Sequence, residues 1–259
     1  MIKLIYRSIA IAGFVALGLS YAPIATAQEE TGEQDAVIPT QVTQNNDDLD
    51  FSSDGRSGNR TGGGSRSECP NLNPPLTALA PSSNAGTTIA SHPTIWVYVP
   101  YTSAQAPIGE FVLQNDQRDD IVRLSFTLPE TPGFVSVTVP DSEAALTGNE
   151  WHLWYFNLYC DPDQNAPPIF AQGWIQRVEL TNEPLHNDGA NLRLDQYYAQ
   201  NGIWFDALNE LATLRRDRPS DPGLLTDWQM LLGADGVELT IAEPEPPFVG
   251  HVHVMNSAR

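Results

Sequence analysis

Residues 151–160 are Trp151-His152-Leu153-Trp154-Tyr155-Phe156-Asn157-Leu158-Tyr159-Cys160. Aromatic residues favour β-strands, and the side chains of a strand alternate between its two faces. Both faces of this run are mostly apolar. We therefore expect a central strand that is covered on both sides, with helices from elsewhere in the chain as one of the covers.

Five more strands are expected because short runs rich in β-branched and aromatic residues alternate with clusters of Pro, Gly, Asn and Asp. Together with Glu150–Cys160, the expected strands are Thr94–Val99, Glu110–Gln114, Ile121–Leu128, Phe134–Val139 and Phe170–Leu180. In Phe134–Val139 the valines share one face, and Ser136 and Thr138 share the other, as a half-exposed strand requires. The even spacing without intervening helices predicts an antiparallel, immunoglobulin-like β-sandwich over residues 69–182.

After residue 187 the apolar period becomes helical, which predicts helices at 191–200, 203–216 and 224–232. Asp221 as N-cap, Pro222 at the first helical position and Gly233 after the end mark the last helix. The spacing resembles the 34-residue tetratricopeptide pattern at Leu194, Tyr198, Gly202, Ala207, Leu211 and Pro219. We expect residues 183–236 to form a tetratricopeptide-like segment of three helices packed on the sandwich, which makes the fold class α+β. Its apolar stripe either binds a peptide or only holds the helices together.

The two ends of the chain are expected to lie outside these units. Lys3 and Arg7 precede eleven apolar residues at 9–19, and Ala25-Thr26-Ala27 follows, so residues 1–27 are typical of a secretory signal peptide. A membrane anchor is the alternative, but a membrane span needs about 20 residues. Residues 28–68 are expected to be a flexible acidic linker rich in Gly and Ser, and residues 237–259 a loose tail that contains prolines.

The expected compartment is therefore periplasmic or extracellular, where two cysteines most simply form one disulfide. Cys69 and Cys160 are the only cysteines. A bond between them closes a loop of about 90 residues, which stabilises a fold by roughly 4 kcal/mol on the chain-entropy model. Two separate buried thiols are the alternative, and a redox-active pair lacks the Cys-x-x-Cys spacing.

The charge of the chain limits its partners. Acidic residues outnumber basic ones 32 to 13, and the net charge of -19 argues against nucleic acid as a partner. The only lysine is Lys3, so a processed chain has no lysine for Schiff-base chemistry or for a phosphate loop. We expect a protein partner to be basic or bridged by cations, with binding that weakens as salt rises. No stretch after the N-terminal segment is long and apolar enough for stable membrane insertion.

The sequence has no Gly-x-Ser-x-Gly elbow, His-Glu-x-x-His, phosphate loop or dinucleotide fingerprint. Asp161, Asp163 and Asn165 have the spacing of calcium ligands, but Ala166 and Gln172 stand where such a loop needs Gly and Glu, which favours an Asp-Pro turn. We therefore expect no catalytic, cofactor-binding or metal-binding residues and no enzymatic activity. An unrecognised hydrolase is the remaining alternative.

The predicted function is that of a non-enzymatic envelope or extracellular protein that binds a protein partner or has a structural role. The alternative is a carbohydrate-binding module, because the six tryptophans and eight tyrosines offer ring planes on which sugars could stack. The candidate interaction surface is Trp151, Trp174, Tyr198, Trp204 and Trp228. Packing in the core is the competing explanation for aromatic residues within strands.

The chain also carries a series of short motifs between residues 55 and 235. They are the Gly-rich, Arg-bearing residues 55–66 leading to Glu68-Cys69-Pro70, then Pro75-Leu76-Thr77-Ala78-Leu79, Pro100-Tyr101-Thr102-Ser103-Ala104, Phe126-Thr127-Leu128-Pro129, Cys160-Asp161-Pro162, and residues 173–179 and 202–208. In this order they resemble an exported cyanobacterial family that is catalogued as domain of unknown function 928. The resemblance implies a periplasmic or secreted protein with no assigned activity, and it brings no catalytic residues.

Overall fold

The computed structural model describes residues 49–63, 66–129, 132–180, 193–241 and 245–255. The expected signal peptide at 1–27 lies outside these residues, as do residues 28–48 of the expected linker and 183–192 of the expected helical segment. Within the described residues the chain has two mixed β-sheets and three helices. The expected α+β class is confirmed.

Six strands lie where the sequence predicts them, with ends that differ by at most three residues. They are β3 (Thr94–Val99), β4 (Ile108–Gln114), β5 (Asp120–Thr127), β6 (Gly133–Thr138), β7 (Trp151–Tyr159) and β8 (Ile169–Arg177). Four shorter strands were not predicted: β1 (Thr77–Ala78), β2 (Ala85–Thr88), β9 (Phe248–His251) and β10 (His253–Val254).

The strand order is β1-β3-β6-β9 in one sheet and β10-β5-β4-β7-β8-β2 in the other. Most neighbours are antiparallel, but β2 runs parallel to β8 and β9 runs parallel to β6. The prediction of a purely antiparallel sandwich is therefore wrong in these two pairings, and the immunoglobulin-like topology stays a prediction. A short hairpin forces antiparallel pairing. Ala85 and its partner Trp174 are instead far apart in the sequence, so the long connection between them lets their strands run in the same direction.

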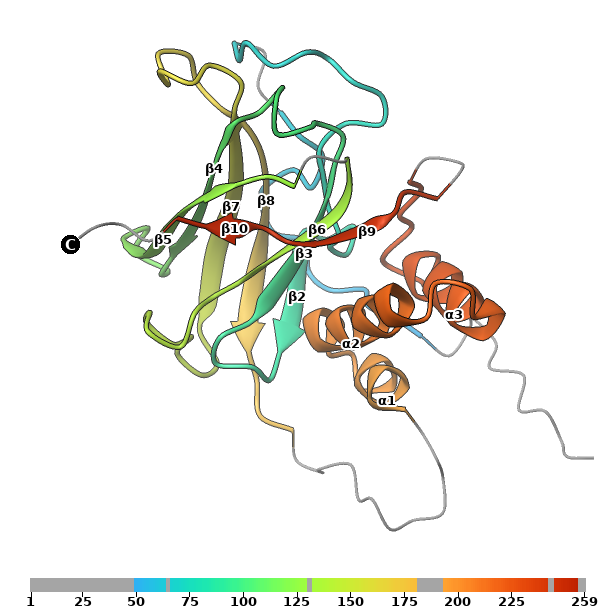
Figure 1. Cartoon of the computed structure of the whole chain (residues 1–259). Helices are drawn as coiled ribbons and strands as arrows, with labels where there is room; N and C mark the ends of the chain where they lie inside the picture. Colours follow the sequence, from blue (N-terminus) through green and yellow to red (C-terminus); the bar gives the residue numbers. More distant parts are fainter. Residues whose placement is uncertain (1–48, 64–65, 130–131, 181–192, 242–244, 256–259) are drawn as a thin grey trace, which may run out of the picture. The chain divides into compact units, whose positions relative to one another are not determined.

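Parts of the expected linker and of the expected tail are packed against the sheets. β9 and β10 lie within residues 237–259, and Figure 1 shows the chain passing from one sheet to the other between these two strands. Phe51 of the expected linker is buried, with its ring 5.0 Å from that of Trp204. Both findings differ from the loose segments that the sequence predicts. Pro246 and Pro247 prevent a helix but leave the following residues free to extend as an edge strand.

The described residues contain three helices, as expected: α1 (Leu194–Gln200), α2 (Trp204–Asp217) and α3 (Pro222–Leu232). Asp221 caps α3, because its carboxylate accepts hydrogen bonds from the backbone N–H groups of Gly223 at 3.0 Å and Leu224 at 3.4 Å. The tetratricopeptide-like interpretation of these helices stays a prediction.

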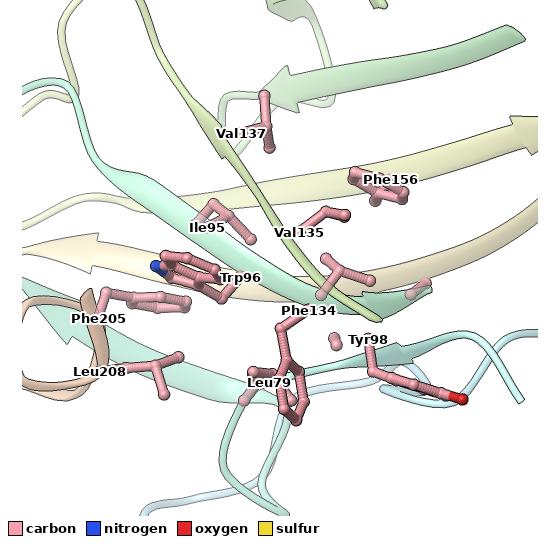
Figure 2. Packing of buried hydrophobic residues seen from close by; sticks show 14 of the residues in the cluster. Leu79, Ile95, Trp96, Tyr98, Phe134, Val135, Val137, Phe156, Phe205 and Leu208 are labelled. Carbon is pink, nitrogen blue, oxygen red and sulfur yellow. The ribbon is translucent and has the colours of Figure 1, made fainter. Parts of the chain in front are cut away.

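The core extends between the two sheets and between the four-stranded sheet and α2. Alternate side chains of β3 pack into these two parts of the core. In Figure 2, Ile95 lies on the side of Val135 and Phe156, whereas Trp96 lies beside Phe205 and Leu208 of α2. The same helix packs on β2, where a Cβ placed on Gly86 would meet the ring of Phe205 at 3.0 Å.

β6 is buried on both faces, although the sequence predicts a half-exposed strand. Residues 133–137 are all buried, and only Thr138 is exposed. The cause is the helical layer, because the ring of Phe134, on the same face as Ser136, is 5.4 Å from that of Trp228 on α3. β9 pairs with β6 at its edge. The hydroxyl of Ser136 is fully buried there and forms a hydrogen bond of 2.8 Å with Nδ1 of His251 on β9.

β7 differs from its prediction in the opposite sense. The helices lie beside β2 and β9 (Figure 1), so they do not cover the outer face of β7. The even-numbered side chains of β7 from His152 to Leu158 are buried. On the other face Leu153 is buried as well, whereas Trp151, Tyr155, Asn157 and Tyr159 are partly exposed. The expected helical cover on the second face is wrong, and the outer face of the six-stranded sheet is partly exposed at this strand, apart from the buried Leu153.

Candidate functional site

The outer face of the six-stranded sheet carries a row of aromatic side chains. Trp151, Tyr155 and Tyr159 follow one another along β7, and each is partly exposed. A strand rises about 3.3 Å per residue, so successive rings of the row are attached roughly 13 Å apart. β8 adds Phe170, whose ring centre is 6.0 Å from that of Tyr155, and Trp174. We call these five residues the aromatic face.

Amide and charged groups lie among the rings. Asn157 of β7 and Gln172 of β8 point to the same side of the sheet and are partly exposed. The Nδ2 atom of Asn157 donates to the Oε1 atom of Glu110 on β4 at 3.4 Å, and Arg123 of β5 forms an ion pair with the same carboxylate. Hydrogen bonds to Asp120 and Glu110 raise the pKa of Arg123. The face therefore offers ring planes beside hydrogen-bonding groups, with the charge of Glu110 compensated.

Two arginines lie over the tryptophans at one end of the aromatic face. The guanidinium carbon of Arg56 is 4.1 Å from the ring centre of Trp151 and 5.0 Å from that of Trp174. The guanidinium carbon of Arg118 is 4.9 Å from the ring of Trp174. Trp174 is only 7% exposed, and its indole N–H donates to the carbonyl of Ser57 at 3.0 Å. The segment that carries Arg56 thus covers Trp174 and leaves Trp151 partly exposed.

A cavity of about 230 Å³ begins beside Trp151. It is lined by residues 50–53, by residues 85–87 around β2, and by Gly202 and Trp204. Small-molecule sites usually enclose about 300–1,000 Å³. This end of the face is therefore better suited to recognition on an open surface than to enclosure of a ligand.

A second cavity, of about 200 Å³, lies between α2 and the segment that joins β2 to β3. We call it the acidic pocket. It is lined by Thr88, Ala90, His92, Thr94, Tyr198, Phe205, Asp206, Asn209 and Glu210. Burial raises the pKa of Asp206, although its carboxylate accepts a hydrogen bond of 3.1 Å from the backbone N–H of Ile89. Burial and the nearby carboxylates of Asp195 and Asp206 raise the pKa of Glu210. The pocket therefore favours a proton or another positive charge beside these two carboxylates.

The five residues of the predicted interaction surface do not lie together. Trp151 belongs to the aromatic face, Trp174 is covered at its end, and Tyr198 lines the acidic pocket. Trp204 and Trp228 are core residues that are 0% and 2% exposed, so the prediction of a surface role is wrong for both. Their rings are buried because they lie on the apolar stripes by which α2 and α3 pack.

The predicted disulfide is confirmed. Cys69 and Cys160 are bonded, with their Cα atoms 5.1 Å apart. The bond joins the residue that follows β7 to the segment that precedes β1. It lies at the end of β7 opposite to Trp151.

Asp161 forms the turn that the sequence favours over a calcium loop. Its two carboxylate oxygens accept hydrogen bonds from the backbone N–H groups of Asp163 at 2.9 Å and Asn165 at 2.7 Å. Within the described ranges, no group of three or more His, Cys, Asp or Glu residues is arranged to hold a metal ion. No helix in the same ranges is both long and apolar enough to cross a lipid bilayer.

Several residues of both sites were not singled out from the sequence. Phe170 and Gln172 occupy alternate positions of β8, and Asp206 and Glu210 are one turn apart on α2. The period-two alternation of β8 was a usable signal for the first pair. Nothing local marks the second pair, because their pocket depends on how α2 packs against the segment after β2.

The chain was compared with protein families, curated proteins and solved structures. The sequence model of one family, described as Domain of Unknown Function (DUF928), matches residues 61–245. No curated protein and no solved structure matches. The matched residues include the strands and helices that build the aromatic face and the acidic pocket.

Proposed function

This chain belongs to the DUF928 family, as its motifs predict, and we propose that it is an exported, non-enzymatic binding protein that holds a carbohydrate on its aromatic face. The observation that carries the proposal is the row of Trp151, Tyr155 and Tyr159 on a sheet face that none of the three described helices covers. Export rests on the signal-peptide pattern of residues 1–27. The disulfide supports it, because such bonds persist in oxidising compartments.

The chemistry of the aromatic face matches that of a sugar. A sugar ring has an apolar C–H plane, which packs on an aromatic ring, and hydroxyl groups at its edge, which bond to amides and carboxylates. Asn157, Gln172 and Glu110 supply such groups beside the rings. The row from residue 151 to residue 159 extends over roughly 26 Å. We therefore expect an extended polysaccharide rather than a single sugar.

Glycan arrays and co-sedimentation with insoluble cellulose, chitin and peptidoglycan test the proposal. The wild type should be retained by at least one of these carbohydrates. Trp151→Ala and Tyr155→Ala should each weaken retention by about tenfold, which corresponds to about 1.4 kcal/mol for one stacked ring. Tyr197→Ala, on α1, removes an equivalent ring away from the sheet and should have no effect. Retention by none of the carbohydrates, or equal retention of all variants, contradicts the proposal.

A basic protein partner at the acidic pocket is a second candidate, favoured by the paired carboxylates of Asp206 and Glu210. A lysine or arginine side chain would interact with these carboxylates and with the rings of Tyr198 and Phe205. The proposed tetratricopeptide-like character of the helices fits this role. The excess of acidic residues in the chain also favours a basic partner.

Pull-down from an envelope extract at low and at high salt tests this second candidate. A basic partner should be lost at high salt and on Glu210→Gln substitution. Asp217→Asn, at the exposed end of the same helix, should retain it and is the matched control. A partner that withstands both salt and Glu210→Gln does not use the acidic pocket.

A further inference from the structure

We propose that residues 55–58 cover a further carbohydrate subsite, formed by Trp174, Gln172 and Asn84 at the end of the aromatic face. We call residues 55–58 the strap. The inference rests on the proposed function and adds a covered part to the same site. It follows from what each residue of the strap contacts.

Three consecutive residues of the strap each cover one part of the subsite. Arg56 lies over the rings of Trp151 and Trp174, at 4.1 Å and 5.0 Å. The carbonyl of Ser57 accepts the hydrogen bond of the Trp174 indole at 3.0 Å. Gly58 lies against the two amides: a Cβ on it would be 2.0 Å from Nδ2 of Asn84 and 2.4 Å from Nε2 of Gln172. The strap thus covers the ring of Trp174, accepts the hydrogen bond of its indole N–H and packs against the amides of Asn84 and Gln172.

The unpaired side-chain amide of Asn84 is the observation that points to a ligand. It is 4% exposed, and neither its Nδ2 nor its Oδ1 atom has a hydrogen-bond partner. Buried amide groups almost always have a partner. With the strap displaced, the hydroxyl groups of a sugar could bond to both atoms of Asn84 and to Gln172, while its ring packs on Trp174. The covered residues therefore offer a ring and amide groups, as the open row does, and the two amide atoms of Asn84 lack the hydrogen bonds that a carbohydrate would supply.

The strap is held loosely between two firm attachments. On one side Phe51 is buried in the core, and on the other the guanidinium of Arg60 donates to the carbonyls of Ala80 and Glu238, each at 3.1 Å. Between them the strap has no regular secondary structure, and its backbone N–H groups make one hydrogen bond in the described structure, from Arg56 to Ser83. Segments with few contacts open locally at low cost. Opening is therefore confined to the few residues that cover the subsite.

If the strap covers the subsite, the direction in which strap variants change carbohydrate affinity can be predicted. When only the open state binds, the apparent dissociation constant is the intrinsic one divided by the open fraction. Weakening the strap should therefore tighten carbohydrate binding. A strap that only supports the fold, or that itself contacts the carbohydrate, predicts weaker binding from the same change.

Two variants open the strap by different means. Gly58→Ala places a methyl group onto Asn84 and Gln172 in a backbone with φ of 152°, and Arg56→Ala removes the stacked guanidinium. Gly55→Ala is the matched control, because the nearest atom to its Cβ is 3.9 Å away. Hydrogen exchange of the Trp174 indole N–H reports opening, and retention on the carbohydrate that binds the wild type reports affinity. Thermal unfolding followed by circular dichroism verifies that each variant is folded.

Both opening variants should exchange the indole proton at least tenfold faster than the wild type. Arg56→Ala should bind about 2- to 30-fold more tightly, the range of cation–π contacts from exposed to desolvated sites. Gly55→Ala should stay within twofold of the wild type in both measurements. Faster exchange with unchanged or weaker binding overturns the inference and leaves the proposed function standing. Binding of no carbohydrate by the wild type overturns both, whereas binding by the wild type that becomes tighter in both opening variants supports both.

Discussion

Removal of the disulfide is expected to lower the free energy of unfolding by about 4–5 kcal/mol. Cys69 and Cys160 are 91 residues apart. For a loop of that length the chain-entropy relation, 2.1 + 1.5R ln n in cal/mol/K, gives roughly 4.6 kcal/mol at 25 °C. This is a large part of the total of about 5–15 kcal/mol that is typical of a folded domain. The bond acts on the unfolded chain, so the native sheets should form without it.

Urea unfolding of the Cys69→Ala/Cys160→Ala double variant measures this loss, with circular dichroism and tryptophan fluorescence as two independent signals. The wild type in a reducing agent should lose the same amount. Carbohydrate retention in the absence of urea should not change, because Trp151 and Cys160 lie at opposite ends of β7. A loss below about 1 kcal/mol refutes the loop-entropy argument, since the relation for this loop gives several times more. Lost retention with a native circular dichroism spectrum refutes the separation of the disulfide from the aromatic face.

Three further substitutions test the acidic pocket and the core. Glu210→Gln should raise stability at pH 7 by about 0.2–0.5 kcal/mol, because it removes a like-charge pair with Asp206 one turn away. Folding raises the pKa of Glu210, so the wild type becomes more stable as pH falls through that pKa. Below pH 4.5, the ordinary pKa of Glu, thermal unfolding should therefore show the variant to be no more stable than the wild type. A variant that is still more stable in acid contradicts the electrostatic cause. Gly109→Ala places its Cβ 2.0 Å from the ring of Phe126 on β5 and should lower the free energy of unfolding in urea by about 1–3 kcal/mol. An unchanged free energy of unfolding would contradict the tight packing at this position. Trp204→Ala should cost about 3–5 kcal/mol; a loss typical of surface residues would contradict its place in the core.

The helices and strands whose ends are marked by neighbouring residues in the sequence could be predicted. The start of α3 follows from Asp221 as a cap and Pro222 as the first helical residue, and Gly233 follows its end. β2 could not be predicted, because its residues 85–88 are small and carry no strand pattern. They form a strand because β8 pairs with them and because Gly86 has no Cβ, which would lie only 3.0 Å from the ring of Phe205 on α2.

The location of the aromatic face could not be predicted, because composition does not tell which sheet the helices cover. Ser136 made β6 look half-exposed, yet a hydrogen bond to His251 lets its hydroxyl be buried beneath the helical layer. The aromatic residues made β7 look covered on both sides. Tyrosine and tryptophan have a polar atom at one edge, so Trp151 and Tyr155 tolerate partial exposure. Each error comes from treating the polarity of a side chain as if it were its exposure.

The partial exposure of the aromatic face needs a physical reason. Each Å² of apolar surface left in water forgoes about 25 cal/mol of stabilisation, and large apolar patches on proteins mark binding surfaces. If these rings served only the fold, the strap would stabilise it most by covering the whole row, yet Arg56 and Ser57 reach only Trp151 and Trp174 at one end of the aromatic face. Tyr155 and Tyr159 lie beyond the strap and remain partly exposed. The division into an open row and a covered end is the arrangement expected if the row makes the first contact with an extended carbohydrate and the strap then yields to it.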